Sequence, residues 1–447
     1  MFRTLGERTS VRIAERDRRR RVYRSVADGF TIPASQVEER SSSHAKPVAK
    51  KRAFQFKIDL PLLLVIISLV VFGLLMVYSA SYDYSFLFYG DSITMFKRQL
   101  IFLGIGLLSM VGLIFVDYHF WRRVAVLVMG VTIFLLVCVF IANEVLNGAS
   151  RTLYRGSIQP SELAKLVIIV YLSVWLFARR EQLSNIQFGL IPLAVILGVL
   201  GGLIVSQPDL SAMVMIFCLG GVMFFLAGGE LRQIGLLLIV ALLVGWLIVQ
   251  ISPTASLRIH DYIAGLKDPT KGSAHVLWSF EAFVKGGWLG VGIGKAETKL
   301  IGLPVPPTDS IYAVVGEETG VFGALGLVFL YGVLLWRGLT IARRAPDMLG
   351  SLLAAGLSIW IALEAFINMS VMVNLLPFAG NALPFISSGG SNLIVSLAAI
   401  GIMLNISRLS TRKKEENGKL FDAVVDLRRW DRRRRVSSAR RAAGFTK

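Results

Sequence analysis

The chain is poor in cysteine, histidine and charge. It holds 2 Cys and 4 His in 447 residues, and only 17% of its residues are charged. Cys138 and Cys218 lie inside apolar runs and the histidines are scattered, so we expect neither a disulfide framework nor a zinc site. Soluble domains carry about 25% charged residues. The low charge and the 54% share of hydrophobic residues favour a protein embedded in lipid.

Long apolar runs recur along the chain. A helix needs about 20 residues to cross the hydrocarbon core, and it satisfies its own backbone polar groups where lipid offers no partner. We therefore expect an all-α polytopic membrane protein with about ten transmembrane helices. The expected spans are Leu60–Ser79, Gln99–Val116, Val124–Ala142, Ala164–Phe177, Phe188–Val205, Ala212–Leu226, Ile234–Ile251, Ile311–Trp336, Leu349–Met372 and Leu393–Ile406.

The net charge of +19 is concentrated at the two ends of the chain. Residues 1–57 form an expected basic tail that is largely disordered, residues 58–408 the membrane domain, and residues 409–447 a second basic tail. Beside a membrane domain, basic tails favour contact with anionic lipid over nucleic acid. We therefore expect membrane lipid, and no nucleic acid, as a partner of the tails.

Positive charges alternate between the loops. With the N-terminus inside, each short inside loop holds at least one arginine, for example Arg122, Arg179, Arg232 and Arg343. The positive-inside rule then places both termini in the cytoplasm, across the cytoplasmic (inner) membrane. The segment of about 252–310, between the seventh and eighth spans, becomes a large extracellular loop. Loops of this length are usually functional, and we expect short helices lying on the membrane surface.

Several cations break this pattern. Arg151, Arg258 and Lys299 fall in the outside loops, and Lys165 lies just inside the fourth span. They are either solvated surface charges or a binding site for an anionic headgroup such as a pyrophosphate, for which Arg and Lys are suited.

Ionisable residues at the span edges are further candidates. Glu162 and Lys165 are three residues apart and share one helix face, as a structural ion pair or as part of a functional site. In Pro306–Asp309, Thr308 or Asp309 can cap the next helix, or Asp309 is a carboxylate at the outer boundary poised as a general base. Glu317 and Glu318 are expected to pack against a basic partner.

A polar break precedes the last span. The segment Pro384–Leu393 is rich in Ser and Gly, which allows close backbone approach or lines a cavity. Ser387 is a candidate for substrate contact there. It is not expected to be a nucleophile, because no histidine or other base accompanies it.

These motifs resemble the SEDS family (shape, elongation, division and sporulation), which includes FtsW and RodA. The resemblance runs from about Asp59 to Arg408, and the order and spacing of its motifs are specific. The motifs are MVYSAS at 76–81, NGASRTL at 147–153, QPSELAK at 159–165, QPDLSAMV at 207–214, GVGIGKAETKL at 290–300, LPVPPTDSIYAVVGEETG at 303–320, EAFINM at 364–369 and LLPFAGNALPFISSGGSNL at 375–393.

The resemblance implies a SEDS fold and a peptidoglycan glycosyltransferase. Such proteins polymerise lipid II outside the membrane and work with a class b penicillin-binding protein that crosslinks the product. Asp309 matches the family's essential aspartate and would accept the proton of the attacking sugar hydroxyl. The leaving group is undecaprenyl pyrophosphate, for which Arg151, Arg258, Lys299 and Lys165 are the candidate cations. A divalent cation, magnesium or manganese, stays open, although no dedicated ligand cluster is visible.

The chain also departs from the family pattern. Thr152 follows Arg151 where an aromatic residue is common, Pro307 stands where His is frequent, and His275 and Trp278 replace loop glutamines. The long basic N-terminal tail and the 375–390 stretch look more like FtsW, which implies septal cell division with other divisome proteins. A RodA-type elongation polymerase, a sporulation paralogue and a lipid II flippase, suggested by the intramembrane Glu162 and Lys165, are the alternatives.

Overall fold

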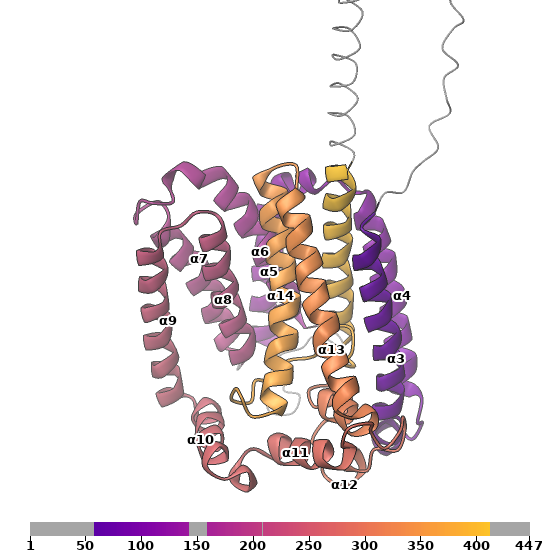
Figure 1. The fold of residues 1–447 in the computed structure, drawn as a ribbon. Helices are drawn as coiled ribbons and strands as arrows, with labels where there is room; N and C mark the ends of the chain where they lie inside the picture. The colour runs from indigo at the N-terminus through magenta and orange to yellow at the C-terminus, as the bar shows by residue number, and fades with distance from the viewer. Residues whose placement is uncertain (1–57, 143–158, 208, 412–447) are drawn as a thin grey trace, which may run out of the picture. The chain divides into compact units, whose positions relative to one another are not determined.

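A computed structural model describes residues 58–142, 159–207 and 209–411 of the chain, and within them every regular element is a helix (Figure 1). The predicted N-terminal tail, the predicted C-terminal tail from residue 412 onward, and Arg151 lie outside these residues. The helices are α3 (Leu60–Tyr89), α4 (Thr94–Phe115), η1 (Tyr118–Phe120), α5 (Trp121–Ala142), α6 (Pro160–Arg179), η2 (Arg180–Gln182), α7 (Leu190–Val205), α8 (Leu210–Leu226), α9 (Leu231–Ile251), α10 (Pro253–Lys267), η3 (Pro269–Lys271), α11 (Ala274–Gly286), α12 (Thr298–Ile301), α13 (Ile311–Arg344), α14 (Met348–Met372) and a last helix, Gly390–Thr411.

The predicted membrane architecture is confirmed. Eight of the described helices are long and apolar enough to cross a membrane, and α7 and α8 are shorter apolar helices of 16 and 17 residues. Together they correspond to the ten expected spans. Most of the helices are longer than the predicted spans, for example α3 with 30 residues and α13 with 34. α13 has a break at Gly320, where φ is 68°. This chain is therefore a multi-pass all-α membrane protein.

Short polar signals set the helix ends. Asp59 caps α3 by accepting a 3.0 Å hydrogen bond from the amide of Leu62, and α3 ends at Gly90 in the left-handed conformation. Asp209 and Asp347 cap α8 and α14 in the same way. These caps begin helices abruptly, which keeps the connections between neighbouring spans short.

The two ends of the membrane domain differ. At one end, upper in Figure 1, α3 begins and the last helix finishes; we call it the terminal end. At the opposite end, α10, α11 and α12 lie across the ends of the spans. We call it the loop end. The predicted long loop thus folds into short helices, as expected, and it stays at one end of the bundle.

The spans are packed unequally. About two thirds of the most apolar window of α6 and of α14 is buried, and 78% of that of the last helix, but only 6% for α9. The centre of the bundle is therefore built from α6, α14 and the last helix, while α9 stands at its edge beside α8 (Figure 1). A sparsely packed edge helix leaves room for a cavity behind it.

Candidate active site

Asp309 lies at the loop end, in the turn between α12 and α13. α13 begins after Ser310, its N-cap residue, so the expectation that Thr308 or Asp309 is the N-cap is wrong. The Asp309 side chain is half-buried. Its backbone carbonyl accepts a 2.9 Å hydrogen bond from the side-chain amide of Asn368 on α14.

The segment before the last helix holds this turn in place. Ser387 donates its hydroxyl to the carbonyl of Thr308 at 2.7 Å, and the amide of Ser388 donates to the carbonyl of Pro307 at 2.8 Å. Asn368 donates its second amide hydrogen to the carbonyl of Asn381 at 2.6 Å. Ser387 therefore acts on the position of the turn through backbone hydrogen bonds, and one asparagine joins the two loops that meet there.

Asp309 is connected to a cation, Arg258, through the loop residues Gly380 and Phe378. Gly380 approaches so closely that a Cβ there would be 3.5 Å from Asp309 Oδ2. Next to it, the ring of Phe378 stacks on His275, with 4.0 Å between the ring centroids, and the guanidinium of Arg258 lies 5.4 Å from the Phe378 centroid. His275 also shares a 2.8 Å hydrogen bond with the hydroxyl of Ser310.

His275 is uncharged at neutral pH. Burial and the nearby positive charge of Arg258 lower the pKa of His275 to about 4. The two groups that stack against Phe378 thus have different roles. Arg258 supplies a positive charge, whereas His275 supplies shape and a hydrogen bond to the residue after Asp309.

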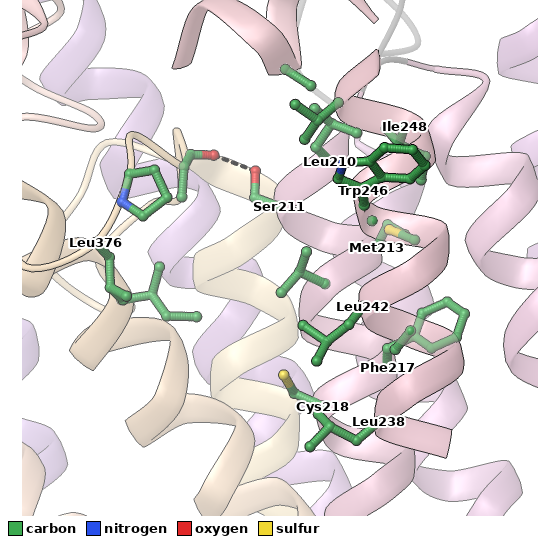
Figure 2. A pocket seen from close by; sticks show the side chains of 18 of the residues that line it. Leu210, Ser211, Met213, Phe217, Cys218, Leu238, Leu242, Trp246, Ile248 and Leu376 are labelled. Carbon is green, nitrogen blue, oxygen red and sulfur yellow. Dashed lines mark hydrogen bonds between the residues drawn. The ribbon is translucent and has the colours of Figure 1, made fainter. Parts of the chain in front are cut away.

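An apolar cavity of about 770 Å³ opens between α8 and α9. Among the described residues that line it, Arg258 is the single charged one. In Figure 2, Leu376 faces the α8 and α9 side chains Met213 and Leu242 across this space, and Ser211 donates its hydroxyl to the carbonyl of Ala379. Phe378 and Asn381 also line the cavity, so its rim reaches the loop beside Asp309.

Lys165 and Glu162 belong to a separate buried network. The ammonium of Lys165 lies 2.8 Å from Glu162 Oε1 and 2.5 Å from Glu364 Oε1. The side-chain amide of Asn392 donates to both carboxylates, at 2.8 and 3.2 Å. Glu364 was part of the motif at 364–369 but was not a candidate site residue, although an acid inside the apolar run 349–372 was a usable signal. The network ties α6, α14 and the last helix together.

Lys299 is part of a third cluster. Its ammonium lies 2.9 Å from Glu318 and 3.0 Å from the hydroxyl of Ser79, and its side chain is 4% exposed. Glu317 accepts hydrogen bonds from the amides of Glu297 and Thr298. The predicted basic partner of the acidic pair is thus Lys299, for Glu318. Ser387 is bonded to the turn of Asp309, and Arg258 reaches the neighbouring loop at Phe378. Lys299 belongs to the separate cluster with Glu318.

No group of three His, Cys, Asp or Glu side chains suited to a metal ion occurs in residues 58–142, 159–207 and 209–411. The divalent cation remains a prediction. His275 was noticed in the sequence only as a departure from a family pattern. Asn368 and Phe378 appeared only as members of the motifs at 364–369 and 375–393, and neither was a candidate site residue.

The fold and the site together define a multi-pass membrane protein with an apolar cavity that opens beside a guanidinium and a carboxylate. Residues 60–412 match the family profile described as "Cell cycle protein", which groups FtsW, RodA and SpoVE, and the chain belongs to this family. It is 37% identical over 358 residues to stage V sporulation protein E of Bacillus subtilis, covering 79% of this chain and 97% of that one. It is 37% identical to a probable peptidoglycan glycosyltransferase FtsW of Trichlorobacter lovleyi, covering 78% and 93%.

Solved structures agree with the fold. One chain of a peptidoglycan synthase complex, solved to show how polymerization and crosslinking are coordinated, is 26% identical, with a TM-score of 0.65 over 79% of this chain and 98% of that one.

Proposed function

We propose that this protein is a peptidoglycan glycosyltransferase that polymerises lipid II, with its loop end on the outer face of the cytoplasmic membrane. The observation that carries this proposal is the apolar cavity whose single charged lining residue, among those described, is Arg258. Such a cavity suits an apolar chain that ends in an anionic group. The curated relatives named peptidoglycan glycosyltransferase support the same activity.

The geometry suggests how the reaction proceeds. The polyprenyl chain of the donor occupies the cavity, and its diphosphate lies against Arg258. Asp309 accepts the proton of a hydroxyl on the acceptor sugar, and the oxygen of that hydroxyl bonds to the anomeric carbon of the donor. The bond from this carbon to the diphosphate breaks, and the electron pair leaves with the diphosphate. Arg258 offsets the negative charge that develops there.

Reconstituted vesicles with lipid II test this reaction. Asp309→Asn should abolish strand formation while the thermal stability of the protein stays within about 1 kcal/mol, since the substitution is isosteric and the turn is held by backbone contacts. Asp268→Asn, an exposed acid at the same end, is the matched control and should polymerise normally. Normal polymerisation by Asp309→Asn would overturn the mechanism.

Arg258 has a distinct test. Arg258→Gln should raise the KM for lipid II and slow the chemical step, because both the bound diphosphate and its developing charge lose a cation. If kcat and KM both stay at the wild-type values, the diphosphate lies elsewhere.

The orientation and the partner are part of the proposal. Arginines at the terminal end, such as Arg122, Arg179 and Arg343, support a cytoplasmic placement of that end. We expect Lys271→Cys at the loop end to react with an impermeant thiol reagent from outside intact cells. A class b penicillin-binding protein is the expected partner, and the match to a chain from a synthase complex supports it.

Septal cell division is the proposed cellular role, with other divisome proteins as partners. The relatives named FtsW support it, while the relative named for sporulation keeps that role as the alternative, beside RodA-type elongation. Localisation of a fluorescent fusion in dividing and in sporulating cells distinguishes them. For the flippase alternative, Lys165 pairs with both Glu162 and Glu364 inside the bundle, which favours a structural role. Transfer of labelled lipid II between vesicle leaflets without polymerisation would support transport.

A further inference from the structure

Large apolar side chains stand exposed in the loop that follows α11. Trp288 is 69% exposed, Leu289 81%, and Leu300 and Ile301 61% each. Soluble surfaces rarely gather so many large apolar groups in one short segment. We call residues 288–301 the apolar loop.

Backbone hydrogen bonds hold the apolar loop against α13. Gly287 and Trp288 accept hydrogen bonds through their carbonyls from the amides of Val321 and Phe322, at 2.9 and 3.3 Å, and the amide of Val291 donates to the carbonyl of Glu317 at 3.0 Å. The apolar loop is thus bonded directly to α13 around its break at Gly320. A segment held this way cannot fold its apolar side chains inward.

Two ion pairs bracket the uncharged stretches of α3 and α13. At the terminal end, Asp59 at the start of α3 pairs with Arg337 of α13 at 2.5 Å. Near the loop end, the Lys299–Glu318 pair contacts Ser79 of α3. Between these points, residues 60–78 and 319–336 contain no charged residue. Each stretch covers about 20 residues, roughly 30 Å along a helix, which is the thickness of a bilayer core.

The positions of the two ion pairs along α13 indicate the depth of the apolar loop in the bilayer. Phe322, to which Trp288 is bonded, lies about 15 residues from Arg337, roughly 22 Å along α13. Trp288 therefore lies on the hydrocarbon side of the Lys299–Glu318 pair. Its ring is 5.9 Å from that of Phe322, and Phe322 and Phe329 are both exposed along α13. The apolar loop thus continues the surface of α13 that faces lipid.

Aromatic residues on α3 lie at the depth of the Lys299–Glu318 pair. Tyr78 and Tyr82 flank Ser79 and are nearly half exposed, with their rings 6.0 Å apart. Tyr and Trp gather at the interface between hydrocarbon and headgroups. Lys295, exposed in the same loop, is placed to reach lipid phosphates.

We infer that the apolar loop inserts into the bilayer leaflet at the loop end and anchors the extramembrane helices to it. The occupant of this surface is lipid: acyl chains around Trp288 and Leu289, and headgroups around Lys295. The inference rests on exposure, backbone pairing and depth, and it is independent of the reaction proposed above.

Spin labels in nanodiscs of phosphatidylethanolamine and phosphatidylglycerol test the insertion. After Cys138→Ala and Cys218→Ala, single cysteines replace Leu289 for the test position, Lys271 as a water control and Leu325 as a hydrocarbon control. Leu289 and Leu325 are 81% and 58% exposed, and the Lys271 side chain 73%, so labels there disturb little packing. The readout is the relaxation caused by oxygen relative to that caused by a water-soluble nickel chelate.

We expect the oxygen-to-nickel ratio at position 289 to approach that at position 325 and to exceed that at position 271 several-fold. A ratio at 289 equal to that at 271 would overturn insertion. So would a label that is reached by nickel in the protein alone and becomes shielded only when a class b penicillin-binding protein is added, because the surface would then be a protein interface.

Discussion

Acidification should lower the free energy of unfolding, because His275 binds a proton more readily in the unfolded chain than in the folded protein. Burial and Arg258 lower the pKa of this histidine to about 4 in the folded protein, against 6.5 for an unperturbed histidine. Above pH 6.5 both states are neutral and the full stability is present. Between pH 6.5 and 4, His275 binds a proton in the unfolded chain but not in the folded protein. The stability therefore falls as the pH falls.

The magnitude follows from the pKa difference. At pH 5 the unfolded histidine is about 1.5 pH units below its pKa while the folded one is still neutral, and at 1.36 kcal/mol per unit the loss is about 2 kcal/mol. His275→Gln cannot take up a proton. Its loss of stability between pH 7.5 and pH 5 should therefore be about 2 kcal/mol smaller than that of the wild type.

Thermal unfolding in detergent micelles at the two pH values, followed by tryptophan fluorescence, measures this difference. His260→Gln is the matched control, because His260 is a loop-end histidine whose side chain is 83% exposed. We expect the control to retain the wild-type pH dependence. If His275→Gln and the wild type lose equal stability on acidification, the histidine does not sit in the buried environment beside Arg258 described above.

Three further experiments test the packing. Lys165→Met should reduce stability by about 3–5 kcal/mol, because it leaves two buried carboxylates without a cation, and a wild-type unfolding midpoint would contradict the buried network. A double-mutant cycle on Asp59→Asn and Arg337→Gln should give a coupling energy of about 2 kcal/mol in unfolding experiments; additive effects would show that the ion pair does not form. Gly320→Ala should cost about 1–3 kcal/mol, since φ is 68° and a Cβ would lie 2.5 Å from the amide nitrogen of Gly290, whereas Gly326→Ala meets nothing within 4 Å and should unfold like the wild type.

The spans were predictable because their signal is local. Each apolar run is read from about 20 neighbouring residues, and the structure has helices at all ten. The ends were less predictable. α3 continues to Tyr89 rather than stopping at Ser79, because residues 80–89 contain no Gly or Pro, and the helix ends only at Gly90 in the left-handed conformation.

The grouping of the charges was not predictable, because it depends on contacts between distant parts of the chain. The sequence placed Lys165, Arg258 and Lys299 as candidates for one anion site. In the structure, Lys165 pairs with Glu364, 199 residues away, and Lys299 pairs with Glu318, so Arg258 is the candidate that lines the apolar cavity. Asp309 was marked by its motif, but its neighbours His275 and Asn368 come from α11 and α14 and are brought to it only by folding.

The ion pairs Asp59–Arg337 and Lys299–Glu318 have a consequence for the choice of membrane. Because both pairs contact the unbroken helix α3, at Asp59 and at Ser79 about 30 Å apart, neither pair can move to follow a thicker bilayer. In such a bilayer the lipid must thin around the protein or the helices must tilt, and either response carries an energetic penalty from hydrophobic mismatch. The protein is therefore matched to one hydrocarbon thickness, and that match sets the height of the Asp309 turn above the lipid from which a membrane-bound substrate would be drawn.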